Sequence, residues 1–121
     1  MAKIVIIDDV DEVRATIRRI LERKGYEVIE ANNGRQGLKA IEKHAPHLVI
    51  TDILMPDMEG LETIQALIKS NSSIPVIAIT ASMDTPYLKI ALKLGAVAGM
   101  YKPFSSQDLL GAIGNALGGV N

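Results

Sequence analysis

Five short runs of β-forming residues alternate along the chain with five longer segments in which apolar residues recur at helical spacing. Three of the runs are nearly continuous apolar stretches, which is typical of strands that helices cover on both faces. The alternation therefore predicts an α/β fold, a doubly wound parallel five-stranded sheet with helices on both sides. The runs are residues 3–8 (KIVIID), 26–30 (YEVIE), 48–52 (LVITD), 75–80 (PVIAIT) and 97–102 (VAGMYK).

The residues at the borders of these segments support the same division. Asp, Asn and Ser side chains accept hydrogen bonds from the free N–H groups of a first helical turn, whereas Gly ends helices and Pro suits their first position. From these preferences we expect Asp11 and Asn33 as N-caps, Gly25 at the end of the first helix, Pro86 at the first helical position after Asp84 or Thr85, and a capping box of Ser105 and Asp108.

Composition narrows the function classes. The 121 residues, 48% of them hydrophobic, fit one domain spanning 1–121, and a net charge of -1 argues against a generally basic nucleic-acid binder. The absence of Cys excludes disulfides, thiolate zinc sites and cysteine nucleophiles. No apolar segment is long enough to span a bilayer and no signal-peptide cleavage region is present, so we expect a cytoplasmic protein.

Acidic, hydroxyl and amine side chains stand where the predicted strands end. Asp8 and Asp9 end the first strand, Asp52 the third, Thr80 the fourth and Lys102 the fifth. Each alone has an ordinary explanation, because acids cap helices, Thr favours strands and a lone Lys is usually solvated. Ligands of open parallel sheets bind beyond the carboxyl ends of the strands, so the coincidence of all these residues at one rim predicts a site.

Charge indicates what this site does. Crowded carboxylates repel one another unless one is protonated or a cation lies among them, and oxygen ligands that also face a phosphoryl group suit Mg²⁺. Asp52 would then act as a nucleophile that accepts a phosphoryl group as an acyl phosphate. Mg²⁺ and Lys102 would neutralise the transferring group, while the Thr80 hydroxyl and the Ala81 amide would donate hydrogen bonds to it.

The motifs IIDDV, TDILMPDMEG, AITA and YKPF, in this order and spacing, resemble the receiver domain of two-component response regulators over residues 3 to 117. The resemblance implies a flavodoxin-like (βα)5 sheet of order 2-1-3-4-5. It assigns Asp52 as phosphoacceptor, and Thr80 and Lys102 as switch hydroxyl and phosphoryl-binding lysine, the latter in a cis bond to Pro103. The implied metal residues are Asp9 as the direct ligand, Asp8 acting through water, the Leu54 carbonyl as a further ligand, and Asp52 itself, with Mn²⁺ as a possible substitute for Mg²⁺.

The implied partners are a sensor histidine kinase or a histidine phosphotransfer protein, and a target bound through the fourth helix, fifth strand and fifth helix. Neither direct nucleic-acid binding nor membrane insertion is expected. Such a domain assists its own phosphorylation and dephosphorylation without turning over a substrate. Because no output module follows residue 117 in this sequence, the signal would pass by protein contact, in a stand-alone regulator, a phosphorelay shuttle or a receiver cut from a larger regulator or hybrid kinase.

Two other functions use related chemistry. A flavodoxin-like FMN-binding protein needs a Ser/Thr/Gly-rich phosphate loop where this chain has Asp8 and Asp9, which would repel a phosphate. A phosphatase of the haloacid dehalogenase type needs a second Asp two residues after the nucleophile, where this chain has Leu54. Both are therefore less favoured than the receiver interpretation.

The chain departs from the family at the position three residues before the lysine, which is usually aromatic and is Gly99 here. Tyr101 lies two residues further on and shares a strand face with Gly99, so it either replaces the switch aromatic or merely covers the edge of the sheet. His44 and His47 are expected to be structural. Arg14 and Arg18, one helical turn apart, either form a solvated face or dock the phosphodonor.

Overall fold

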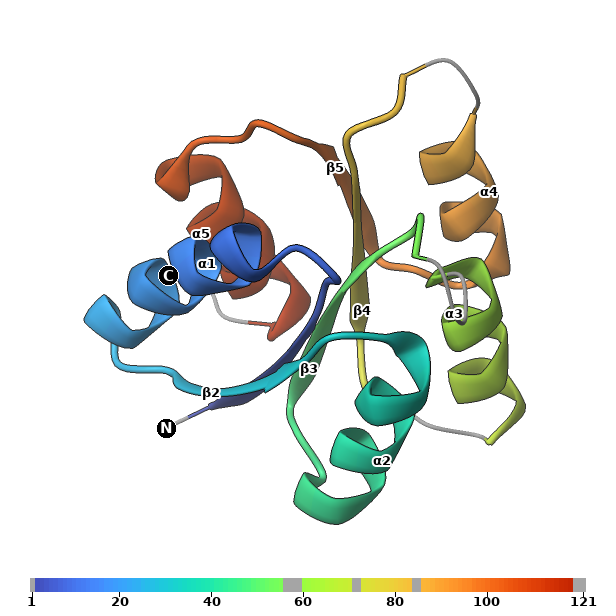
Figure 1. Ribbon diagram of the computed structural model, residues 1–121, viewed down its shortest axis with the longest axis horizontal. Helices are drawn as coiled ribbons and strands as arrows, with labels where there is room; N and C mark the ends of the chain where they lie inside the picture. The colour runs from blue at the N-terminus through green and yellow to red at the C-terminus, as the bar shows by residue number, and fades with distance from the viewer. Residues whose placement is uncertain (1, 56–59, 71–72, 84–85, 119–121) are drawn as a thin grey trace.

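A computed structural model of the chain describes residues 2–55, 60–70, 73–83 and 86–118 (Figure 1). The sheet is parallel with the order β2-β1-β3-β4-β5, which confirms the flavodoxin-like (βα)5 prediction. Each predicted strand is found, and its ends lie within one residue of the predicted ones. The strands are β1 (Lys3–Ile7), β2 (Glu27–Ala31), β3 (Leu48–Asp52), β4 (Val76–Thr80) and β5 (Ala98–Tyr101).

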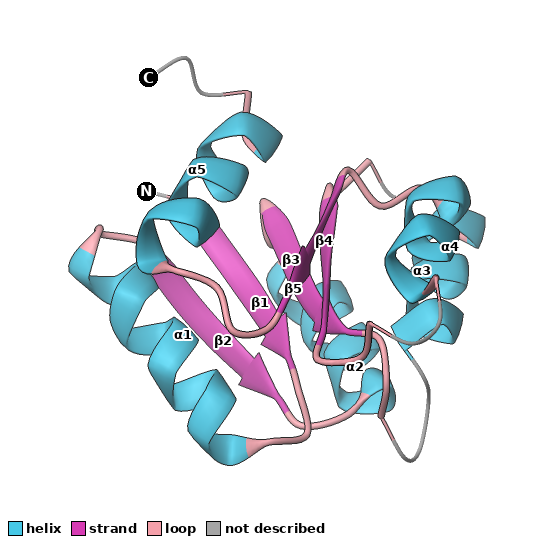
Figure 2. Ribbon diagram, turned by 90° about the horizontal axis from the view of Figure 1, so that it is seen from above, coloured by secondary structure: helices cyan, strands magenta, loops and turns pink. Residues whose placement is uncertain are grey.

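Five helices follow the strands and form a layer on each face of the sheet. They are α1 (Asp11–Arg23), α2 (Gly34–His44), α3 (Gly60–Lys69), α4 (Tyr87–Leu94) and α5 (Ser106–Ala116). Figures 1 and 2 show α1 and α5 together on one side, and α2, α3 and α4 on the other. Among the described residues, no helix is long and apolar enough to cross a membrane.

The strands feed two apolar cores because successive side chains point to opposite faces. Ile4 and Ile6 of β1 belong to the core under α1 and α5, whereas Val5 and Ile7 belong to the core under the other three helices. All four are fully buried, as are most residues of β3 and β4. A sheet covered on both faces explains why these strands read as continuous apolar runs.

Three of the predicted helix borders are confirmed. The Asn33 side chain accepts a hydrogen bond from the Gln36 N–H at 2.9 Å, and Ser105 Oγ accepts one from the Asp108 N–H at 3.0 Å. Gly25 follows the end of α1 with a φ of 98°, a left-handed conformation that costs glycine little.

Two of the border predictions are wrong by one residue. Helix α1 begins at Asp11 itself, with Val10 as its N-cap, so Asp11 is not the capping residue. The turn before the helix is closed by Asp8, whose Oδ1 accepts the Val10 N–H at 2.9 Å. Pro86 is the N-cap of α4 and not its first helical residue, and the alternatives Asp84 and Thr85 lie outside the described residues.

The start of α3 lies against the end of β3. The Gly60 N–H donates to the Ile53 carbonyl at 2.7 Å. A Cβ added to Gly60 would lie 2.5 Å from the Ile53 Cα and 2.8 Å from the Asp52 carbonyl carbon, and nearer still to the Asp52 carbonyl oxygen. Only glycine permits this approach, which fixes the backbone just after the predicted phosphoacceptor.

Candidate functional site

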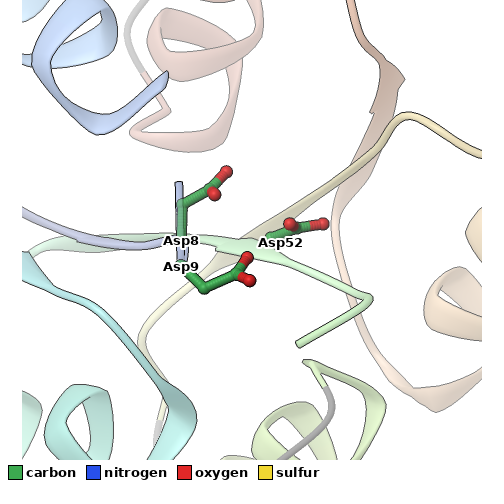
Figure 3. Close-up of side chains that lie close together, drawn as sticks. All are labelled: Asp8, Asp9 and Asp52. Atoms are coloured by element: carbon green, nitrogen blue, oxygen red, sulfur yellow. The ribbon is translucent and has the colours of Figure 1, made fainter. Parts of the chain in front are cut away.

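Three carboxylates meet at the carboxyl ends of β1 and β3. Ile7 pairs with Thr51 across the two strands, so the residues that follow, Asp8 and Asp52, lie beside each other. One carboxylate oxygen from each of Asp8, Asp9 and Asp52 lies within 4.8 Å of the others. Figure 3 shows Asp8 and Asp9 leaving the end of β1 with their carboxylates directed to the side on which Asp52 lies. Asp8 and Asp52 are buried, whereas Asp9 is exposed.

Lys102 reaches this cluster from the end of β5. Its Nζ lies 2.8 Å from Asp8 Oδ2 and 3.3 Å from Asp52 Oδ2. The Lys102 N–H donates to the Thr80 carbonyl at 2.8 Å, and the bond to Pro103 is cis, as the family resemblance implies. The structure therefore brings the predicted acids and the predicted lysine into one site.

Burial and the charge of the neighbouring partner have opposite effects on the pKa values of Asp52 and Lys102. The pKa of the Asp52 carboxyl is raised, because burial and the neighbouring Asp8 charge outweigh the favourable charge of Lys102. Burial lowers the pKa of the Lys102 ammonium, but its hydrogen bond to Asp8 and the charges of Asp52 and Asp8 outweigh this and raise it overall. One ammonium thus lies between two buried carboxylates, nearer to that of Asp8 than to that of Asp52.

The remaining predicted site residues surround Asp52. Thr80 ends β4, the strand beside β3, and its Oγ1 accepts the Ser82 N–H at 3.2 Å. Ala81 follows at the surface. The Leu54 N–H donates to Asp52 Oδ1 at 3.3 Å, and the Leu54 side chain is 37% exposed. Because Asp52 pairs with Ile79 in the β3–β4 ladder, Thr80 is the next residue along β4 beyond the level of Asp52.

The position of the missing aromatic is occupied from another element. A Cβ on Gly99 would lie 3.2 to 3.3 Å from the Cβ and both Cδ atoms of Leu88 on α4, so the Leu88 side chain fills that space. Thr80 pairs with Tyr101 in the β4–β5 ladder, and Tyr101 is 39% exposed. The two interpretations of Tyr101, switch or edge cover, both remain compatible with this arrangement.

Arg14 makes a site contact that sequence reasoning missed. Its Nη1 donates to the main-chain carbonyl of Asp8 at 2.6 Å, its Nε to Glu30 at 3.1 Å and its Nη2 to Asp11 at 2.5 Å. Only 13% of the side chain is exposed, so it is not part of a solvated face. Arg18 also binds Glu30, at 2.6 Å, but is 41% exposed. No local spacing signals the Glu30 contact, because it joins α1 to a strand 16 residues away.

The two histidines lie at the other end of the sheet, before β3 begins. His47 Nδ1 accepts the Lys3 N–H at 2.9 Å, and the His44 carbonyl accepts the Lys3 ammonium at 3.2 Å. Both contacts hold the start of β1 to the start of β3. This placement agrees with the structural role that we expect for them.

The family model described as "Response regulator receiver domain" matches residues 4–114. A receiver domain protein from Clostridium thermocellum superposes with a TM-score of 0.92 at 33% identity, covering 98% of this chain and 95% of that one.

Two curated relatives come from Bacillus subtilis (strain 168). Alkaline phosphatase synthesis transcriptional regulatory protein PhoP is 33% identical over 88% of this chain and 45% of its own length. Sporulation initiation phosphotransferase F is 31% identical over 92% of this chain and 90% of its own length. The chain spans about half the length of most of the transcriptional regulators that it matches. With the family model covering most of its residues, the chain belongs to the response regulator receiver domain family.

Proposed function

We propose that Asp52 accepts a phosphoryl group from a phosphohistidine of a sensor kinase or phosphotransfer protein. An Asp52 carboxylate oxygen would attack phosphorus, forming a P–O bond as the P–N bond of the phosphohistidine breaks, and the neutral imidazole would leave with the proton that its other ring nitrogen already carries. The observation that carries this proposal is the convergence of Asp52 with Asp8, Asp9 and Lys102 at one rim of the sheet. Buried acids at this density are costly for folding alone, so their presence is best explained by chemistry.

The donor set fits a divalent cation. Carboxylate oxygens from Asp8, Asp9 and Asp52 within 4.8 Å of one another suit a hard ion such as Mg²⁺ or Mn²⁺. We propose direct bonds from Asp9, Asp52 and the Leu54 carbonyl, and a water-mediated contact from Asp8. Bound there, the ion supplies positive charge for the oxygens of the transferring phosphoryl group.

The remaining residues stabilise the product. The Lys102 ammonium, now shared between two carboxylates, would move its contact from Asp52 to a phosphoryl oxygen. The Thr80 hydroxyl and the Ala81 N–H would donate to the other oxygens. Leu54 stands two residues after Asp52, where a phosphatase of the haloacid dehalogenase type has its acid–base Asp, and for this reason we propose a phosphoacceptor and not a turnover enzyme.

A groove beside the site fits the docking of a phosphodonor helix. It has a volume of about 490 Å³, and its walls include Val13 and Ile17 of α1, Ala81, and Phe104 after β5. Lys102 also lines it, so a side chain of a partner lying in the groove would approach the acidic cluster. We propose cytoplasmic kinases or phosphotransfer proteins as these partners.

For output we propose the face formed by α4, β5 and α5. Exposed apolar side chains on and beside it include Ile90, Val97 and Tyr101. A target protein could cover them after phosphorylation changes the loop that follows Thr80. A phosphorelay shuttle is the second candidate, favoured by the match to sporulation initiation phosphotransferase F along 90% of that protein's length.

The test is intact-protein mass spectrometry after incubation with a small acyl phosphate donor and Mg²⁺. The parent should gain one phosphoryl group, and Asp52→Asn should gain none while keeping its fold, because the swap is nearly isosteric. A phosphorylated Asp52→Asn variant would refute the assignment. Transfer from the phosphorylated chain to a second histidine protein would favour the shuttle.

A further inference from the structure

Arg14 ties three elements together beneath the acidic cluster. The guanidinium binds Asp8 at the end of β1, Glu30 in β2, and Asp11 in its own helix α1. A planar group with five donors in a fixed fork can hold such partners at once, which a single ammonium cannot. With 13% of its side chain exposed, Arg14 lies between the layers and not on the surface.

The Asp8 carbonyl is the important partner for the site. This carbonyl belongs to the peptide unit that joins Asp8 to Asp9, so fixing its direction fixes where the Asp9 backbone turns. The other bonds of the loop hold Asp8 itself: its N–H donates to the Ala31 carbonyl at 3.1 Å, and its Oδ1 accepts the Val10 N–H at 2.9 Å. Asp9 is exposed, and within the part of the chain that the structure describes its side chain forms no hydrogen bond.

We propose that Arg14 is a positioning residue for the metal site, which it organises by holding the Asp8–Asp9 peptide so that the Asp9 carboxylate stays beside Asp52. This inference rests on the proposed function, because it takes the acidic cluster to be a divalent-cation site. Groups that orient metal ligands commonly affect affinity by about 10- to 100-fold when they are removed. Here the effect should lie near the lower end, because Asp8 retains its bonds to Ala31, Val10 and Lys102.

Charge alone predicts the opposite result. Removing a cation that lies near three carboxylates makes the cluster more negative and should favour Mg²⁺ binding. The Mg²⁺ affinity of Arg14→Ala therefore distinguishes the two explanations: it should fall if Arg14 positions the Asp8–Asp9 peptide, and rise if only the charge of Arg14 matters. Arg18→Ala is the matched control, because Arg18 binds the same Glu30 from the next turn of α1, whereas its hydrogen bonds among the described residues go to Glu30 and Glu22 and not to the Asp8–Asp9 loop.

The experiment is a Mg²⁺ titration followed by amide NMR shifts, without a phosphodonor, on the parent, Arg14→Ala, Arg14→Lys and Arg18→Ala. We expect Mg²⁺ affinity to fall about tenfold in Arg14→Ala. It should also fall in Arg14→Lys, which keeps the charge and loses the fork, and it should be unchanged or slightly higher in Arg18→Ala. Before metal is added, the Val10 amide should exchange with solvent faster in Arg14→Ala than in the Arg18→Ala control.

A phosphorylation assay supplies the second readout. The Arg14 variants should be slow at limiting Mg²⁺ and should approach the parent rate at saturating Mg²⁺, a separation that general destabilisation would not produce. Equal or tighter Mg²⁺ binding by Arg14→Ala would overturn the proposal. Because the titration needs no phosphodonor, it stands even where Asp52 fails to accept a phosphoryl group, so the two proposals fail separately.

Discussion

Replacing Gly60 by alanine places a methyl group where the end of β3 already lies. The added Cβ would be 2.5 Å from the Ile53 Cα and 2.8 Å from the Asp52 carbonyl carbon, both backbone atoms that no rotamer change can move. Carbon atoms at van der Waals contact are roughly 3.5 to 4.0 Å apart, so the start of α3 must shift by about 1 Å. Overpacking of this kind costs about 1 to 3 kcal/mol.

The control is Gly111→Ala in the middle of α5, where an added Cβ meets nothing within 4 Å. Alanine should there stabilise the helix by about 0.5 to 1 kcal/mol. For a domain of this size, 1 kcal/mol shifts Tm by about 4 °C. Thermal denaturation followed by circular dichroism should therefore show Gly60→Ala about 4 to 12 °C below the parent and Gly111→Ala about 2 to 4 °C above it.

The added Cβ also clashes with the Asp52 carbonyl, so we expect the substitution to affect the reactivity of Asp52 as well as the stability of the fold. Gly60→Ala should accept a phosphoryl group more slowly than Gly111→Ala, even at temperatures where both are folded. A Gly60→Ala variant with the parent's Tm and phosphorylation rate would refute the reasoning, since it would mean that the backbone near Asp52 yields without cost.

Three further predictions concern Asp52, the proposed phosphoacceptor, and residues around it. In chelator-treated protein, Asp52→Asn should be more stable than the parent at neutral pH by about 0.5 to 2 kcal/mol. Because folding raises the pKa of Asp52 above 3.8, the folded parent binds a proton at Asp52 more readily than the unfolded chain does. The free energy of unfolding of the parent should therefore rise as the pH falls through the folded pKa. Urea titrations should show the difference in stability between Asp52→Asn and the parent becoming smaller over that range. Leu54→Asn should shorten the acyl phosphate lifetime severalfold, because an amide can orient an attacking water; a lifetime equal to the parent's by mass spectrometry would contradict this. Tyr101→Ala should leave phosphorylation near normal but reduce the amide NMR shifts that a phosphoryl mimic induces in α4 and β5; identical shifts would leave Tyr101 as edge cover.

The strands and the gathering of site residues could be predicted from the sequence, because both follow from local pattern. A buried parallel strand must be apolar along its length, and its last residue must lie at the ligand-binding rim. Asp52 and Lys102 are 50 residues apart in sequence, yet the topology alone brings them together. The strand order came from the family resemblance, since periodicity does not specify which strands pair.

Contacts that depend on side-chain reach could not be predicted in this way. The helix border at Asp11 was wrong because Asp8, three residues earlier, closes the turn with its own carboxylate. The sequence shows that Gly99 lacks an aromatic ring, but not that Leu88 of α4 fills the space. In the sequence, Arg14 is one of several cationic residues of the first helix. Only the folded structure shows that its guanidinium donates a hydrogen bond to the Asp8 carbonyl.

The charges of the site couple Lys102 to the three carboxylates, so a change at one of these groups affects the others. Asp8, Asp9 and Asp52 face a single ammonium, and Lys102 lies nearer to Asp8 than to Asp52, at 2.8 Å against 3.3 Å. At Asp52, burial and the neighbouring Asp8 charge outweigh this more distant ammonium and raise the pKa of the carboxyl. A divalent cation among the three acids would remove most of this excess negative charge and release Lys102 from Asp52. Under the proposed function, the cation and Lys102 would therefore compete for the Asp52 carboxylate, and an Asp52 held by the cation would leave Lys102 to bind the incoming phosphoryl group.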